Sequence, residues 1–373
     1  MPIYEVTAWV MLVALAVYTL LGGADFGAGV WDLLATGPRR ARQREALAHA
    51  IGPIWEANHV WLIVVIVLMF TCFPPAFAAI MTALHVPILL VLLGIVLRGS
   101  SFVFRTYTPP DCVRARALWG EVFAIASLLT PVMLGVTLGA LATGRLLWDD
   151  RGVYISGFIE PWALSPLCWS VGLFTLAIFA YLAAVYLCAE DEPFVATDPL
   201  ADVGQAAPSP PGADATALRE DFRIRALAAA VAVGVLAGVT WLLAVREAPL
   251  LSRELWASWW AIPLQIATGL AAVTALWALW TRRYALARAA AVLQVTLIVV
   301  GYGAAIFPYL VVPQVTIEAS AAPARMHRLV LGALAAGAVI LLPSLWYLLR
   351  SFKGERAFTV IDRPAPPPPA LRG

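Results

Sequence analysis

Apolar runs of about twenty residues or more recur along the whole chain, and this feature constrains the fold more than any other. Such a run is long enough to cross the hydrocarbon core of a bilayer as a helix. Hydrophobic residues make up 62% of the 373-residue sequence and charged residues 13%, whereas soluble proteins have roughly 45–50% and about 25%. The sequence therefore predicts an all-α polytopic membrane protein with about nine transmembrane helices, arranged as two four-helix bundles plus one peripheral helix.

One segment poor in apolar runs divides the chain. Residues 190–221 begin with a Pro/Ala/Asp-rich stretch, which cannot span a bilayer and is predicted to be a cytoplasmic linker. This linker separates a first membrane bundle at 1–189 from a second at 222–352, and a Pro-rich cytoplasmic tail follows at 353–373. The expected spans cover residues 7–35, 50–71, 76–104, 118–141, 161–187, 222–245, 257–280, 285–307 and 326–349.

Arginine residues are concentrated in alternate loops. The loop after the first expected span carries four of them within residues 39–44, and further groups follow the third, fifth, seventh and ninth spans. Because cytoplasmic loops of membrane proteins are enriched in Lys and Arg, we expect these loops in the cytoplasm, with the N-terminus outside and the C-terminus inside. The net charge of +2 does not favour nucleic acid as a partner.

Three charged residues lie inside consecutive apolar spans. By the rise of a helix, Asp25 lies about 15 Å, Glu56 about 9 Å and Arg98 about 10 Å from the cytoplasmic ends of their spans. All three are therefore expected at a similar depth in the inner half of the bilayer. Buried ionisable residues of this kind commonly face protein or water and serve proton relays.

The residues around these acids support a shared site. On the first helix Gly22, Asp25 and Gly29 lie on one face, where missing side chains allow close approach to the carboxylate. On the second helix Glu56 and His59 are three residues apart and line one side. We therefore predict a proton path through Asp25 and Glu56.

Two further groups are weaker candidates for this path. His59 can join the two acids, and Glu121 lies on the fourth expected helix. The alternative interpretation of the buried charges is structural: Arg98 pairs with one of the acids and locks three helices together.

The histidines are the residues that could bind a haem iron. His59 and His85 are expected inside the membrane, and His49 and His327 at its surfaces. An axial ligand for haem iron is conceivable, but no paired-histidine pattern is evident and a hydrogen-bonded core histidine is favoured. The four cysteines have no CxxC spacing, so they support neither a metal site nor a disulfide framework.

Two motifs carry a family resemblance. The segments LGGADFGAG at 21–29 and GPIWEANHVWLI at 52–63 closely resemble those of subunit II of the cytochrome bd-type quinol oxidases, also described as the cytochrome d ubiquinol oxidase subunit II family. Arg98, the Phe307–Pro308–Tyr309 turn and the short stretch 348–354 fit as well, and the resemblance covers essentially the whole chain.

The resemblance implies a function. Such a subunit looks like the non-haem partner of a homologous subunit I, which carries haem b and haem d and oxidises quinol. The heterodimer is an electrogenic, oxygen-reducing respiratory enzyme of the bacterial cytoplasmic (inner) membrane, and cytoplasmic protons enter it partly through subunit II. The resemblance is compatible with a structural quinone in this chain and with a further small single-helix subunit.

Site residues carry over from the two motifs. Asp25 and Glu56 match the acids, Trp55 and Asn58 stand beside the second acid, and Arg98 matches the partner base. Two positions differ from the family pattern. Many relatives have Asp where this chain has Glu56, and Gln or Glu where it has His59.

Two other functions belong to different classes. The chain could be a stand-alone proton-coupled transporter, but the second half does not repeat the buried acids of the first, as a two-fold transporter site would require. It could also be an electron carrier that binds its own b haem. Purification would separate these alternatives, because a non-haem subunit alone is colourless and co-purifies with a larger haem-containing chain.

Overall fold

The computed structural model describes residues 1–51, 55–109, 112–149, 151–189 and 213–353. Within the helices, the side chains of residues 45, 48–51, 55–57, 106, 213–215 and 348–353 lie outside the description. Most of the predicted linker and nearly all of the Pro-rich tail are outside the described residues as well.

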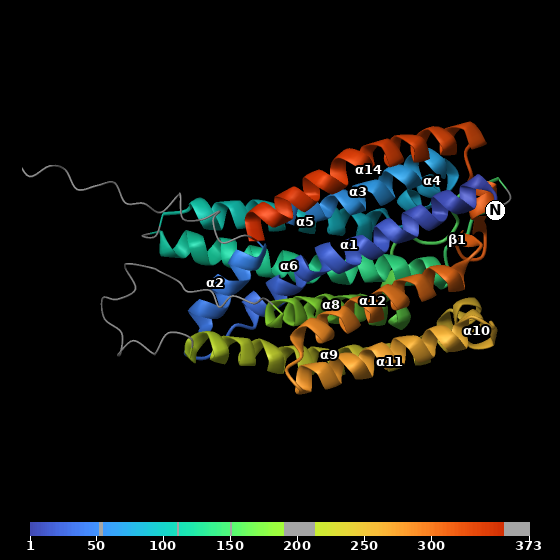
Figure 1. Cartoon of the computed structure of the whole chain (residues 1–373). Helices are drawn as coiled ribbons and strands as arrows, with labels where there is room; N and C mark the ends of the chain where they lie inside the picture. Colours follow the sequence, from blue (N-terminus) through green and yellow to red (C-terminus); the bar gives the residue numbers. More distant parts are fainter. Residues whose placement is uncertain (52–54, 110–111, 150, 190–212, 354–373) are drawn as a thin grey trace, which may run out of the picture. The chain divides into compact units, whose positions relative to one another are not determined.

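Helices form nearly all of the regular structure in these residues (Figure 1). The elements are α1 (Ile3–Leu33), α2 (Arg40–Ile51), α3 (Trp55–Cys72), α4 (Pro74–Ala83), α5 (His85–Tyr107), α6 (Val113–Ala142), α7 (Glu160–Ala163), α8 (Pro166–Cys188), α9 (Ala213–Glu247), α10 (Pro249–Ala257), α11 (Ala261–Trp280), α12 (Tyr284–Ile306), β1 (Tyr309–Val311), β2 (Val315–Thr316), α13 (Ile317–Ser320) and α14 (Ala324–Lys353). The two short strands pair antiparallel.

Eight of the described helices are long and apolar enough to span a membrane. A ninth span results if α3 and α4, which meet at an angle of 115°, are counted as one broken span. The prediction of an all-α polytopic membrane protein with about nine spans is therefore confirmed.

The predicted third span, 76–104, is wrong at its start. The chain forms α4 first, breaks at Leu84 and continues as α5 from His85. Pro87 explains the break, because it has no N–H to donate to the carbonyl of Ala83 and its ring would clash with that carbonyl in a continuous helix. In the first turn of α5 the missing N–H is tolerated.

Two other boundaries also differ from the prediction. The predicted span 161–187 is divided into α7 and α8, because Ser165 caps α8 by accepting a hydrogen bond from the Cys168 amide at 3.3 Å. The predicted span 257–280 begins later, at Ala261, and the short helix α10 precedes it.

The arginine-rich first loop contains the helix α2, which the sequence analysis did not predict. Arg39 donates to both carboxylate oxygens of Asp221 at 2.6 and 2.9 Å, and Gln43 donates to the same carboxylate at 3.0 Å. Arg225 in turn donates to the Gln43 side chain at 2.7 Å. These contacts fasten α2 to α9 at the end of the bundle where α1 ends and α9 begins (Figure 1).

The chain divides into two compact units, Met1–His327 and Arg328–Gly373. The first unit contains α1 to α13 and the first residues of α14. In it, α8 packs against α1, α6 and α9, and α5 packs against α6. Most of α14 belongs to the second unit, where large apolar side chains such as Val339 and Ile340 are exposed.

The contact between α1 and α8 depends on a glycine. A Cβ atom added at Gly27 would lie 1.9 Å from the carbonyl oxygen of Phe179, so the two backbones approach more closely than any side chain permits. One turn further, the Trp31 indole donates to the Ala180 carbonyl at 2.8 Å. This close packing holds the middle of α1, including Asp25, in a fixed position.

Replacing Gly27 with alanine is expected to destabilise the protein by about 2 kcal/mol or more, because the α8 backbone has to move. Thermal unfolding of the purified protein measures the effect. Gly234→Ala is the matched control, since a Cβ atom there meets nothing within 4 Å. Equal unfolding temperatures for the two variants would contradict the proposed close packing.

Candidate functional site

Asp25 lies where α1, α3 and α5 meet. Its side chain is buried, and Asn58 on α3 donates to its carboxylate oxygen Oδ2 at 2.6 Å. Arg98 on α5 donates from Nη2 to the backbone carbonyl of Asp25 at 2.8 Å. Asn58 is 6% exposed and Arg98 only 2%. The structure thus brings an acid, an amide and a guanidinium together inside the bundle, and we call these three residues the Asp25 cluster.

Two aromatic rings hold the guanidinium of Arg98. Its carbon Cζ lies 4.8 Å from the centroid of Phe26 and 5.1 Å from that of Phe123. Cation–π contacts of this kind are strongest where water is excluded. Among the described residues, Arg98 contacts Asp25 through the backbone carbonyl rather than the carboxylate. The cluster therefore joins helices through a backbone hydrogen bond of Arg98, and an ion pair of Arg98 with Glu56 lies outside the described residues.

His59 lies beside the Asp25 cluster. Its ring centroid is 5.9 Å from that of Phe26 and 6.0 Å from that of Tyr18, both on α1. The imidazole is therefore held between two aromatic rings of α1, one residue along α3 from Asn58.

Three other predicted site residues lie on α3 and α6. The backbones of Trp55 and Glu56 begin α3, but their side chains lie outside the described residues. Glu121 is exposed on α6, and no contact between described residues joins it to the Asp25 cluster. Its part in a proton path remains a prediction without structural support from the described contacts.

Two further histidines lie at or near the starts of helices. His85, expected inside, is exposed at the start of α5, where its Nδ1 atom lies 3.0 Å from the Thr82 carbonyl. His327, expected at the surface, is fully buried and shares a hydrogen bond of 2.8 Å with the Thr7 hydroxyl. The first residues of α14 therefore lie against the start of α1. No local sequence pattern predicts this contact. The side chain of His49 lies outside the described residues.

Asp32 is a buried acid that the sequence analysis missed. It is 4% exposed, and Arg105 and Arg44 lie 3.2 and 3.7 Å from its carboxylate. Burial lowers the pKa of Arg44, and the neighbouring Asp32 carboxylate opposes this shift. Asp32 follows Asp25 by seven residues and therefore shares its face of α1, a spacing that the sequence already contained.

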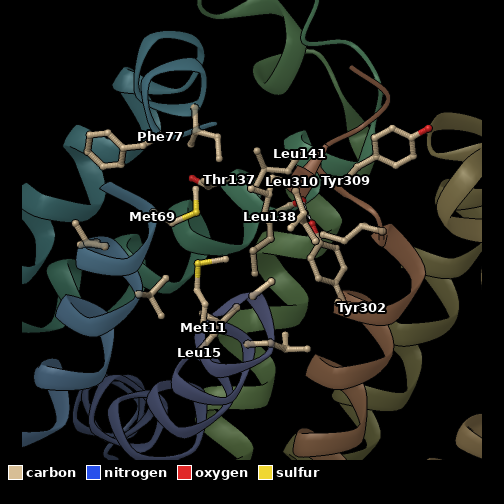
Figure 2. A pocket seen from close by; sticks show the side chains of 18 of the residues that line it. Met11, Leu15, Met69, Phe77, Thr137, Leu138, Leu141, Tyr302, Tyr309 and Leu310 are labelled. Atoms are coloured by element: carbon tan, nitrogen blue, oxygen red, sulfur yellow. Dashed lines mark hydrogen bonds between the residues drawn. The ribbon is translucent and has the colours of Figure 1, made fainter. Parts of the chain in front are cut away.

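An apolar cavity of about 300 Å³ lies between α1, α3, α4, α6, α12 and β1 (Figure 2). Its lining includes Met11, Leu15, Met69, Phe77 and Leu138, as the close view shows. The hydroxyls of Thr137 and Tyr302 also face it, but they donate to the backbone carbonyls of Met133 and Leu138 at 2.8 and 2.6 Å. The cavity therefore offers contacts mainly to hydrocarbon.

No group of three or more metal-ligating side chains occurs in the described part of the chain. The four cysteines are free, with Cys112 exposed and the other three buried. The fold and the Asp25 cluster together define the class: a multi-pass, all-α membrane protein with an ionisable cluster inside its first helices.

The family follows from comparison with known proteins. The family model for cytochrome bd terminal oxidase subunit II matches residues 3–203 and 212–352, so the chain belongs to this family.

Individual relatives match over part of their length. The chain is 29% identical over 180 residues to cytochrome bd ubiquinol oxidase subunit 2 of Bacillus subtilis, which is 46% of this chain and 52% of the relative. It is 27% identical over 191 residues to cytochrome bd-I ubiquinol oxidase subunit 2 of Escherichia coli K12, or 49% of each chain. The matches thus span about half the length of these curated relatives.

A solved structure shares the fold. A chain of the bd oxidase from Geobacillus thermodenitrificans superposes with a TM-score of 0.69, covering 94% of this chain and 99% of that one at 24% identity.

Proposed function

We propose that this chain is the non-haem subunit II of a bd-type quinol:oxygen oxidoreductase, that it pairs with a haem-bearing subunit I, and that it supplies part of a proton path from the cytoplasm. The family match supports the oxidase, and the buried Asp25 cluster is the observation that supports the proton path. The family match also favours this role over a stand-alone transporter or a carrier with its own b haem.

The residues of the Asp25 cluster have the chemistry of a proton-holding site. The carboxylate of Asp25 is buried in the protein, and Asn58 donates to one of its two oxygens, Oδ2. Arg98 places a fixed positive charge beside the acid without occupying its carboxylate. Charged groups kept apart from water interact strongly, so protonation of Asp25 responds to small changes nearby.

Glu56 and His59 extend this site along α3. Glu56 stands near the start of α3, and the arginine-rich segments nearby indicate that this end faces the cytoplasm. We therefore propose that protons pass from Glu56 to Asp25, with His59 beside them. Trp55, Asn58 and Arg98 support these groups, and Glu121 is a further acid at the entrance. The N-terminus then lies outside and the C-terminus in the cytoplasm.

The haems of the oxidase are proposed to lie in subunit I. The described histidines of this chain do not fit a haem, because His59 is packed between two aromatic rings, His85 is exposed and His327 is bonded to Thr7. A structural quinone in this chain would place its isoprenoid tail in the apolar cavity, whose hydroxyls are already engaged.

Co-purification tests the proposal. A tagged chain isolated from membranes of the source cell is expected to carry a larger haem-containing membrane protein, and the visible spectrum should remain with that partner after the two are separated. A chain that purifies without a haem-bearing partner, or that is itself coloured by haem, would contradict the assignment.

A further inference from the structure

One face of α1 carries three polar residues at equal spacing. Tyr18, Asp25 and Asp32 follow one another at intervals of seven residues, which places them on one side of the helix about 10 Å apart. We call this set the α1 stripe. Asp32 is engaged by two arginines at the end where α1 finishes, and Asp25 lies in the cluster described above. Of the three residues, Tyr18 lies furthest from the end of α1, and the proposed function gives it no role.

The ring of Tyr18 lies over the helix toward Asp25. A Cβ atom added at Gly22 would be 2.7 Å from the Cε2 atom of Tyr18, so the ring occupies the space that a side chain at position 22 would need. Gly22 stands between Tyr18 and Asp25 in the sequence. The ring also faces His59, at 6.0 Å between centroids.

The hydroxyl of Tyr18 is buried within electrostatic reach of Asp25 and Arg98. Tyr18 is 2% exposed, and neither its hydroxyl nor the Nε atom of Arg98 has a hydrogen-bond partner among the described residues. A buried polar group without a partner is energetically costly. Buried water molecules commonly satisfy such groups where several converge.

We propose that Tyr18 is a positioning residue of the proton path, and that its hydroxyl holds a water molecule against the carboxyl group of Asp25. The inference rests on the proposed function and assigns a further residue to the same site. In this arrangement the phenol donates its hydrogen to the water and stays neutral, while a proton exchanges between the water and Asp25. Beyond Tyr18, Leu15 and Leu62 line the apolar cavity, so the polar path ends at this hydroxyl.

Tyr18→Phe in the complete oxidase tests the proposal. The readout is the infrared band of the protonated Asp25 carboxyl, identified as the band that Asp25→Asn removes. We expect Tyr18→Phe to shift this band to higher frequency, because the carboxyl loses a water-mediated hydrogen bond, and to slow proton uptake several-fold. Thermal stability should stay the same or rise, since only an unpaired hydroxyl is removed.

Tyr181→Phe is the matched control. Tyr181 is also buried, at 1% exposure. Within the described residues its hydroxyl lacks a hydrogen-bond partner and no ion pair or charged contact involves it. Removing the Tyr181 hydroxyl should change neither the Asp25 infrared band nor the rate of proton uptake. An unshifted Asp25 band in Tyr18→Phe overturns the role of Tyr18 and leaves the proposed function intact. If Asp25→Asn itself leaves proton uptake unchanged, the proposed proton path fails and the role of Tyr18 fails with it.

Discussion

Asp25→Asn is expected to lower the oxygen-consuming turnover of the assembled oxidase by at least about tenfold, a lower bound against the roughly 10²–10⁴-fold that positioned acids and bases contribute. The amide has the same shape as the carboxylate, and a rotated amide can still accept from Asn58. Arg98 keeps its contact, because it bonds to the backbone carbonyl. The substitution therefore removes the exchangeable proton with little change in packing. Oxygen consumption with a soluble quinol measures the effect.

Asp149→Asn is the matched control for this experiment. It makes the same chemical change at an exposed turn, where the carboxylate caps the amides of Arg151 and Val153. Turnover should stay at the wild-type level. If Asp25→Asn behaves like this control, Asp25 carries no protons that the reaction needs.

Arg98→Ala is expected to destabilise the chain by about 3–5 kcal/mol, as truncation of a large buried side chain does. The variant leaves a cavity between Phe26 and Phe123 and removes the hydrogen bond to Asp25. It also removes the positive charge beside the acid. We expect a sharp loss of assembled protein, measured as yield after purification and as thermal unfolding of the surviving fraction.

Arg246→Ala provides the comparison, since Arg246 is exposed near the end of α9. Surface substitutions of this kind usually change stability by less than about 0.5 kcal/mol. An Arg98→Ala protein as stable as Arg246→Ala would show that the buried guanidinium contributes nothing to the packing of α1, α5 and α6.

The sequence alone predicts the number of spans and the shared level of Asp25 and Arg98 in the bundle. Span number follows from run length, and the shared level follows from the helical rise. The sequence does not predict which atoms meet. The contact from Arg98 to the Asp25 carbonyl depends on side-chain packing across three helices, and the rings of Phe26 and Phe123 come from separate spans.

Some other features of the structure have signals in the sequence that a hydropathy profile does not detect. Pro87 marks the start of α5, but its neighbours are as apolar as those of a continuous span. Tyr18 and Asp32 share the face of Asp25 by their spacing of seven residues, but a tyrosine in an apolar run resembles a packing residue. The burial of His327 depends on Thr7, 320 residues away, and no local pattern predicts it.

Proton uptake by the oxidase in lipid vesicles tests the central claim most directly. A pH-sensitive dye on the side of the arginine-rich loops, with oxygen supplied to the fully reduced enzyme, reports the rate at which protons enter. We expect rapid uptake from that side by the wild-type protein and a rate lower by at least about tenfold in Asp25→Asn. Uptake at the wild-type rate in Asp25→Asn would contradict it.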